Sequence, residues 1–152
     1  MKKFLFLFIA ALSLTACEID DDGPGTVQVI AEVVDTTLPE SLEEGKLYDF
    51  KITYLLPDAC HTGIGVQAMR EGSGEVERRK IYVAGVASRP ANQTTCNLED
   101  DDLEVEGSFS MRIEGDEPYT FYLWTGVDVD GKSVYNEVVV PVGEEEPTTP
   151  EE

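Results

Sequence analysis

The chain has few of the residues from which enzymes build catalytic and metal centres. Its 152 residues include one histidine (His61), one tryptophan and three cysteines. A Ser-His-Asp or Cys-His catalytic arrangement would have to use His61. A transition-metal site would lack ligands, because one histidine without a free thiol cannot build one. The 31 acidic residues show no pair at a spacing typical of hydrolases. The sequence therefore predicts a protein that is not an enzyme and holds no cofactor.

Basic residues are also scarce, with 11 Lys and Arg against 31 Asp and Glu and a net charge of −20. Removal of a signal peptide would take Lys2 and Lys3 away and leave 9 basic residues, for a formal charge of −22. This balance excludes nucleic-acid binding and direct docking on anionic lipid headgroups. The one basic cluster, Arg78-Arg79-Lys80, is expected to lie on a strand. It is either solvated surface or a patch that recognises a partner.

The apolar run at 4–14 is too short to cross a bilayer, which takes about 20 residues. Its length and the two preceding lysines are typical of a signal peptide. The run ends in Leu14-Thr15-Ala16-Cys17, which resembles a lipobox. The resemblance implies cleavage after Ala16 and a diacylglycerol, of the palmitate type, on the Cys17 thiol. Residues 1–16 are therefore predicted to be a cleaved lipoprotein signal peptide.

Acidic, apolar-poor segments flank the central part of the chain. Residues 17–25 form a lipidated tether with the acidic cluster 18–22, which resembles the export tag of Bacteroidota-type lipoproteins. That tag leads to the outer leaflet of the outer membrane; the alternative is a solvated spacer on the periplasmic face. Residues 143–152 contain nothing apolar to bury and are predicted to be disordered. One domain at 26–142 remains, at an outer membrane to which lipid anchors it.

Lipidation of Cys17 would leave an even pair, Cys60 and Cys96, in an oxidising compartment. A disulfide between them is the prediction, and closing such a loop stabilises a domain by roughly 4 kcal/mol. A redox or catalytic thiol would need a CxxC spacing or a nearby base. His61 adjoins Cys60, but neighbouring side chains of an extended strand point to opposite faces.

Apolar and polar residues alternate with a period of two, and no helical stripe is sustained. The alternation predicts seven strands, at 27–33, 48–54, 64–68, 81–86, 103–113, 119–124 and 134–142. Asp130-Gly131 predicts a tight hairpin between the last two. The fold class is all-β, a single antiparallel sandwich with an Ig-like topology. Unlike the usual Ig bridge, the disulfide is expected to hold the irregular connection 88–102 at the rim.

Several stretches together resemble uncharacterised lipoproteins of flavobacteria and their relatives. They are Leu-Pro-Asp-Ala-Cys at 56–60, the later cysteine, the run 119–126 (YTFYLWTG), Asp130-Gly131 and 138–142 (VVVPV). The resemblance covers most of residues 45–142. It implies the same fold and disulfide, and it brings no known activity.

Two stretches are candidate binding sites. The loop 97–104 carries Asp100, Asp101 and Asp102, whose oxygens suit calcium, although such loops are more often solvated. Asp128 and Asp130 echo a calcium loop but lack its later glutamate, which favours a turn.

The aromatic pair Trp124 and Tyr122 could stack on a sugar, or Trp124 could pack against the core. Asn92 and Thr36 match N-linked and O-linked glycosylation patterns, respectively.

The sequence favours a non-enzymatic, membrane-anchored interaction or structural module of the cell envelope, with an envelope protein or a glycan as its partner. One alternative is a glycan- or calcium-binding accessory module of an outer-membrane complex. The other is a hydrolase with an unrecognised pair of carboxylates.

Overall fold

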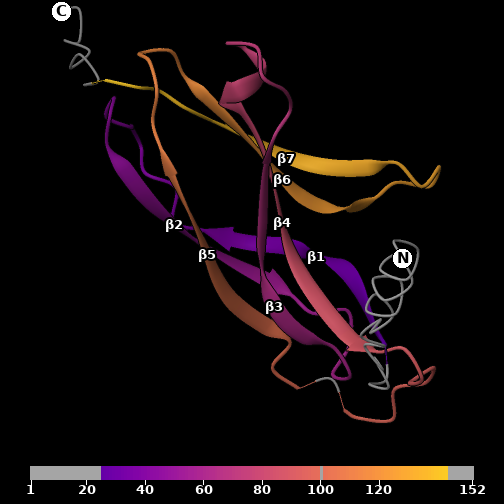
Figure 1. Ribbon diagram of the computed structural model, residues 1–152. Helices are drawn as coiled ribbons and strands as arrows, with labels where there is room; N and C mark the ends of the chain where they lie inside the picture. The colour runs from indigo at the N-terminus through magenta and orange to yellow at the C-terminus, as the bar shows by residue number, and fades with distance from the viewer. Residues whose placement is uncertain (1–24, 100, 144–152) are drawn as a thin grey trace, which may run out of the picture.

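Alternating apolar residues build seven strands in the computed structural model, which describes residues 25–99 and 101–143 (Figure 1). The strands are β1 (Thr26–Thr36), β2 (Leu47–Leu55), β3 (Thr62–Arg70), β4 (Lys80–Pro90), β5 (Glu104–Arg112), β6 (Tyr119–Val127) and β7 (Ser133–Val140). A single 3₁₀ turn, η1 (Glu77–Arg79), precedes β4. The all-β class and all seven predicted strands are confirmed. In the part of the chain that is described, no helix is long and apolar enough to cross a membrane.

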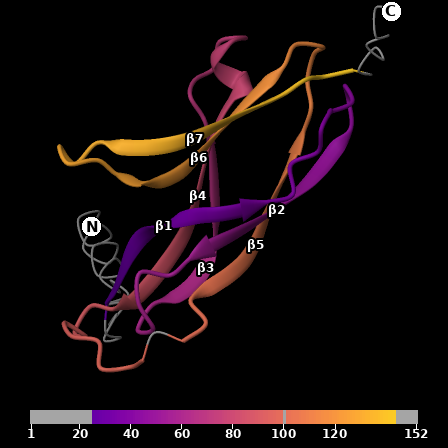
Figure 2. The same cartoon turned by 180° about the vertical axis from the view of Figure 1, so that it is seen from behind.

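The strands form one mixed sheet that does not close, in the order β5-β2-β1-β4-β6-β7 with β3 also paired to β4 (Figures 1 and 2). β1 joins the two halves, because residues 26–31 pair with β4 and residues 32–36 pair with β2. β3 pairs with residues 81–88 of β4. The opposite edge of β4 is shared between β6, at residues 80–83, and β1, at residues 85–90.

The expectation of a wholly antiparallel sheet is wrong for one pair, because β4 and β6 run parallel. The reason lies in the connection. After β4 the chain crosses to the far end of the sheet, where β5 pairs with β2. It then returns to the edge of β4 in the direction that β4 itself runs. All other pairings among the described strands are antiparallel.

The core lies where the β2–β5 half of the sheet folds over the β4–β6–β7 half. The Phe50 ring of β2 lies 5.1 Å from that of its neighbour Phe109 and 5.4 Å from Phe121 of β6, which is not its neighbour in the sheet. Ile81 and Val83 of β4 are buried in the same cluster. Burial of each such side chain contributes about 1.5–3 kcal/mol, so these alternating positions hold the two halves together.

A second core cluster explains the glycine in the middle of β4. Tyr54 of β2 is almost completely buried beside Ala31 and Ala87. A Cβ on Gly85 would overlap the ring carbons of Tyr54, and one on Gly63 would overlap its hydroxyl end. These two glycines therefore let the backbones of β4 and β3 approach a tyrosine that a larger residue would displace.

The hairpin between β6 and β7 confirms the turn predicted at Asp130-Gly131. Oδ1 of Asp128 accepts the backbone N–H groups of Asp130 and Lys132, both at 2.9 Å. Gly131 has φ 77°, a left-handed conformation that glycine adopts without steric cost. The Asp128 carboxylate thus supports a turn, as the lack of a later glutamate suggested.

Candidate functional site

The structure confirms the disulfide between Cys60 and Cys96, with an S–S distance of 2.03 Å. Cys60 lies in the turn that follows β2, and Cys96 lies in the connection between β4 and β5, whose described residues form no strand. The bridge holds this connection against the end of the sheet, as predicted. A shallow hollow of about 310 Å³ beside it is lined by Asp58, His61, Arg89, Thr94 and Thr95 among others.

His61 is buried beside the disulfide, where its Nδ1 lies 2.7 Å from Oδ1 of Asp58. The same Oδ1 accepts the backbone N–H of Cys60 at 2.9 Å. The hydrogen bond from His61 is the main cause that lowers the pKa of Asp58 below its ordinary value. Because the Cys60 sulfur is bridged, His61 and Cys60 form no catalytic pair. The carboxylate and the imidazole instead fix the turn that presents Cys60 to Cys96.

The lowered pKa of Asp58 predicts how stability depends on pH. A carboxyl group whose folded pKa is depressed contributes stability above its unfolded pKa of about 3.9, and the contribution is lost as pH falls through the folded pKa. We expect Asp58→Asn to unfold at lower urea than the parent chain at pH 6. The gap should narrow as the pH is lowered toward 2. Urea titrations across this pH range measure the difference in urea midpoint, with exposed Asp101→Asn as the charge-matched control. A difference that does not change with pH contradicts the prediction.

The calcium site predicted in the acidic loop stays a prediction, because only part of that loop is described. Asp100 lies outside the described residues, while Asp101 and Asp102 are both exposed. Among the residues that the structure describes, the one group of three potential ligand atoms within 4.8 Å is Asp58, Cys60 and Cys96. Its two sulfurs are joined to each other, so this group offers a metal only one carboxylate.

Tyr122, a predicted binding residue, belongs to a cluster of three tyrosines on the outer face of the sheet. Its ring stacks on that of Tyr82 of β4, with centroids 4.7 Å apart and planes inclined by 13°. Tyr135 of β7 meets both rings edge-on, at 5.2 Å from Tyr82 and 6.3 Å from Tyr122. Trp124, the other predicted residue, is the register partner of Tyr135. Tyr82 and Tyr135 were not predicted, because only the strand register brings them to Tyr122.

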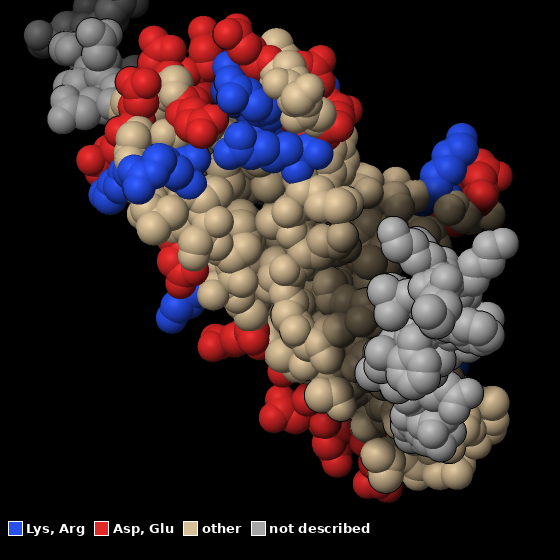
Figure 3. Space-filling model, viewed as in Figure 1, with Lys and Arg blue, Asp and Glu red and all other residues tan. Residues whose placement is uncertain are grey.

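Apolar side chains extend the tyrosine cluster onto the neighbouring strands. The register places Ile30 of β1, Met69 of β3, Val86 of β4 and Val139 of β7 on the same face. Met69 is 53% exposed, Val139 58% and Tyr135 36%. Figure 3 shows much of the middle of one view in tan, with most of the Lys, Arg, Asp and Glu toward its two ends. We call the face that carries Tyr82, Tyr122 and Tyr135 the tyrosine face.

Charged residues lie at the border of the tyrosine face and at one position within it. Exposed Glu137 of β7 is the register partner of Tyr122 and therefore shares its face. Lys80 binds Glu71 at 2.6 Å, and the Tyr82 hydroxyl donates to the other oxygen of Glu71 at 3.4 Å. Burial is the main cause that raises the pKa of Tyr82. The hydroxyl therefore stays protonated and neutral at physiological pH.

The basic cluster at 78–80 was expected to lie on a strand, and this expectation is wrong for two of its residues. Arg78 and Arg79 belong to the 3₁₀ turn, and only Lys80 enters β4. Arg78 reaches Glu114 at 3.3 Å, and Lys80 is paired with Glu71. The cluster is thus divided between two carboxylates and does not form a continuous basic patch.

Comparison with known proteins identifies no relative: no family model, curated protein or solved structure matches this chain. The function is therefore argued from the residues and surfaces described above.

Proposed function

We propose that this protein is a non-enzymatic interaction module of the bacterial cell envelope, which docks a partner protein on the tyrosine face. The observation that carries the proposal is the exposed, mainly apolar surface around Tyr82, Tyr122 and Tyr135, with Glu137 as one charge within it, on a chain of net charge −20. Contiguous apolar surface rimmed by polar residues is typical of a protein–protein interface. Tyrosine is among the residues that contribute most to binding at such interfaces.

The packing of the rings favours a protein partner over a glycan. Sugars stack on the open face of an aromatic ring. Tyr82 and Tyr122 cover one face of each other, and Tyr135 stands edge-on to both. The cluster is therefore a ridge of ring edges and hydroxyls with apolar flanks. A protein surface can follow such relief with its own side chains, whereas a flat sugar ring cannot.

The proposal includes the lipid anchor on Cys17 and a place at the outer membrane, as the lipobox and the acidic cluster imply. Residues 1–24 lie outside the described part of the chain. Support comes from the Cys60–Cys96 bridge, because disulfides persist in exported proteins. Further support is that β1 begins at Thr26, directly after the proposed tether. Protease treatment of whole cells distinguishes the surface, where the domain is cut, from the periplasmic face, where it is protected.

We also propose that the domain is a variant of the Ig-like sandwich. The division of β1 between two halves of the sheet supports it, as does the packing of Phe50 of β2 on Phe121 of β6. The parallel pairing of β4 and β6 departs from that topology.

Site-specific crosslinking tests the tyrosine face. A photoreactive phenylalanine analogue in place of Tyr135 should crosslink one envelope protein in living cells of the native host. The same analogue at Leu47, which is exposed on β2, should not. The double variant Tyr135→Ala/Val139→Ser should weaken capture of that protein by about tenfold or more, since central tyrosines each contribute 1–2 kcal/mol or more. Both side chains are exposed, so the variant should fold.

Two results contradict the proposal. One is equal capture by the double variant and by a Leu47→Ala control. The other is saturable thermal stabilisation by a polysaccharide that the double variant abolishes, which would assign the face to a glycan instead.

A further inference from the structure

The two strands at the ends of the path β5-β2-β1-β4-β3 leave a seam in the sheet. β5 pairs only with β2 and β3 only with β4, and the two strands are not paired with each other. They touch at one end, where a Cβ on Gly107 would lie 2.7 Å from the Val66 side chain. Toward Arg70 and Arg112 they diverge, as Figures 1 and 2 show from opposite sides. The seam is therefore a wedge that opens toward the ends of β3 and β5.

Each strand presents unused backbone groups to this wedge. The N–H of Glu71 donates to the carbonyl of Lys80. Because hydrogen-bonded pairs alternate along an antiparallel ladder, the backbone N–H and C=O groups of Met69 also point toward β4, and those of Ala68 and Arg70 point away from it. On the other side, Ile113 exchanges hydrogen bonds with Lys46 and Gly45. By the same alternation, Ser110 and Arg112 turn their N–H and C=O groups away from β2. Two rows of donors and acceptors thus border the wedge.

The wedge encloses a groove of about 430 Å³. Its lining combines apolar residues, Val66, Ala68, Ile81, Phe109 and Met111 among them, with polar and charged ones. Alternate residues of an extended chain could place apolar side chains on this floor, because side chains alternate in direction along a strand.

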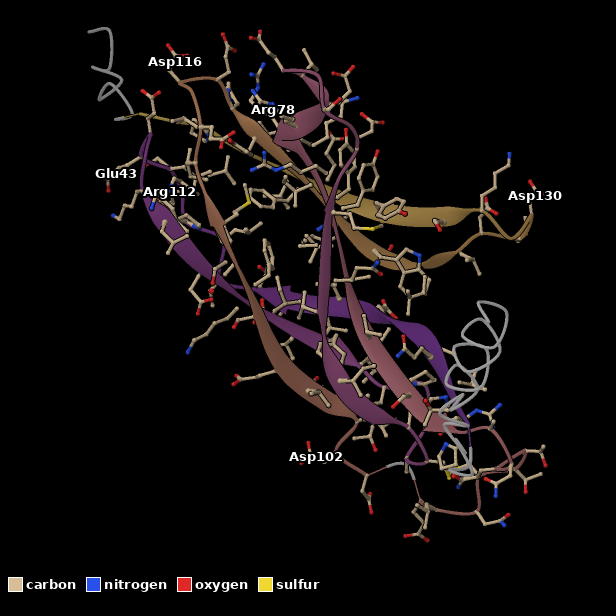
Figure 4. All side chains as sticks on the ribbon, viewed as in Figure 1. Glu43, Arg78, Asp102, Arg112, Asp116 and Asp130 are labelled. Carbon is tan, nitrogen blue, oxygen red and sulfur yellow. A yellow bond between two sulfur atoms is a disulfide. The ribbon has the colours of Figure 1, made fainter. Side chains whose placement is uncertain are left out.

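Two arginines lie at the open end of the groove. Arg70 and Arg112 line it, and Arg70 and Arg78 share a single carboxylate oxygen of Glu114, at 3.6 and 3.3 Å. The Arg112 guanidinium donates to the carbonyl of Gly45. Of the charged residues that line the groove, two are arginines, Arg70 and Arg112, and one is a carboxylate, Glu114, so the lining carries net positive charge on a chain of net charge −20. Figure 4 shows Arg78 and Arg112 at the same end of the molecule as Glu43 and Asp116, opposite Asp102.

We propose that this groove binds an extended, acidic segment of a partner protein as an added strand between β3 and β5. Backbone groups of the segment pair with the free edges, its apolar side chains cover Phe109 and Met111, and its carboxylates meet Arg70 and Arg112. The two rows of backbone groups favour a peptide over an anionic lipid, which has no donors to match them. The groove does not include Tyr82, Tyr122 or Tyr135, although Met69 borders both the groove and the tyrosine face. The proposal rests on the free strand edges and on Phe109, Met111, Arg70 and Arg112, and not on the tyrosine face.

Two methionines make the groove directly observable. Met69 and Met111 both line it, and Met1 is the only other methionine in the chain. The full chain in detergent solution, labelled with ¹³C at the methionine methyl groups, is titrated with the capped peptide VEVEVE. The methyl resonance of Met111 should shift saturably, with a Kd of about 0.1–1 mM for so short a peptide. That of Met69 should shift with it, whereas a shift of Met69 alone would indicate binding to the tyrosine face and would overturn the proposal. The capped peptide VKVKVK should bind roughly tenfold more weakly, since two like-charge contacts replace two attractive ones.

Variants separate the charge from the strand pairing. Arg70→Glu should reverse the preference toward VKVKVK, while Arg89→Glu, an equal change of charge that is not at the groove, should leave it unchanged. Ala68→Pro removes one backbone donor from the free edge of β3, where proline is tolerated, and should weaken VEVEVE severalfold. Absence of a saturable shift up to about 5 mM overturns the proposal. Equal binding of both peptides to the parent chain also overturns it.

Discussion

Replacing Cys17 by serine should abolish the incorporation of labelled palmitate into the protein and stop cleavage after Ala16. A diacylglycerol is attached through a thioether, and a serine hydroxyl is too weak a nucleophile to replace the thiol. Two or three acyl chains at about 0.8 kcal/mol per buried CH₂ hold a protein on a membrane, whereas one chain is marginal. The expected effect is therefore all or none, and mass spectrometry of the intact protein from a lipoprotein-processing host measures it.

The control for the Cys17 variant is the double variant Cys60→Ser/Cys96→Ser, which removes two cysteines and should keep the full label. The parent chain should also partition into the detergent phase after processing, with the mass of the chain from Cys17 plus its lipid. Label that persists in Cys17→Ser contradicts the anchor. A parent chain that is cut at another residue and carries no lipid does so as well.

The positions of the seven strands could be predicted because alternation is a local property of the sequence. Tyr48, Phe50, Ile52 and Tyr54 alternate with polar residues, and this repeat alone places β2. The ends of strands were less accessible. β1 continues to Thr36 and β4 to Pro90, beyond the residues that alternate most clearly. These extensions depend on hydrogen bonds to β2 and to the start of β1, which are made by residues distant in the sequence.

Which strands pair could not be predicted from the same pattern. The apolar residues of β4 and β6 indicate that each strand is buried on one face. They do not indicate whether the two strands run parallel or antiparallel. The parallel pairing of Ile81 with Phe121 follows from the position of β5 on the other half of the sheet. The prediction of an Ig-like topology implied that all neighbouring strands are antiparallel, and it was therefore wrong for β4 and β6.

Only part of the tyrosine face could be predicted, because the contacts between its residues depend on which strands pair. Tyr122 and Trp124 lie on one short run and could be recognised together. Tyr82 alternates with Ile81 and Val83, so its outward direction could have been predicted, but not its contact with Tyr122. That contact, and the one with Tyr135, depends on the register between three strands. The groove between β3 and β5 was missed entirely, since it exists only because those two edges do not pair.

Removing the disulfide should destabilise the domain by roughly 4 kcal/mol. The bridge closes a loop of 36 residues, and the chain-entropy model gives about this value for such a loop. Cys60→Ala/Cys96→Ala should therefore unfold at about 2 M lower urea, if the denaturant slope is near 2 kcal/mol per molar. Circular dichroism in a urea series measures the change. Most of the effect acts on the unfolded chain, so the folded spectrum should be nearly unchanged.

Reduction provides the internal control for the disulfide, because dithiothreitol should lower the urea midpoint of the parent chain and leave that of the double alanine variant unchanged. A second measurement separates loop closure from local packing. The backbone hydrogen bond from Leu56 to Leu103 joins the end of β2 to the far end of the connection that the bridge constrains. If the bridge also holds this connection in place, the amide of Leu56 should exchange faster with solvent in the variant than the amides of core β6. A midpoint that shifts by less than about 0.5 M, the equivalent of about 1 kcal/mol, would mean that the unfolded chain gains little freedom when the bridge is lost.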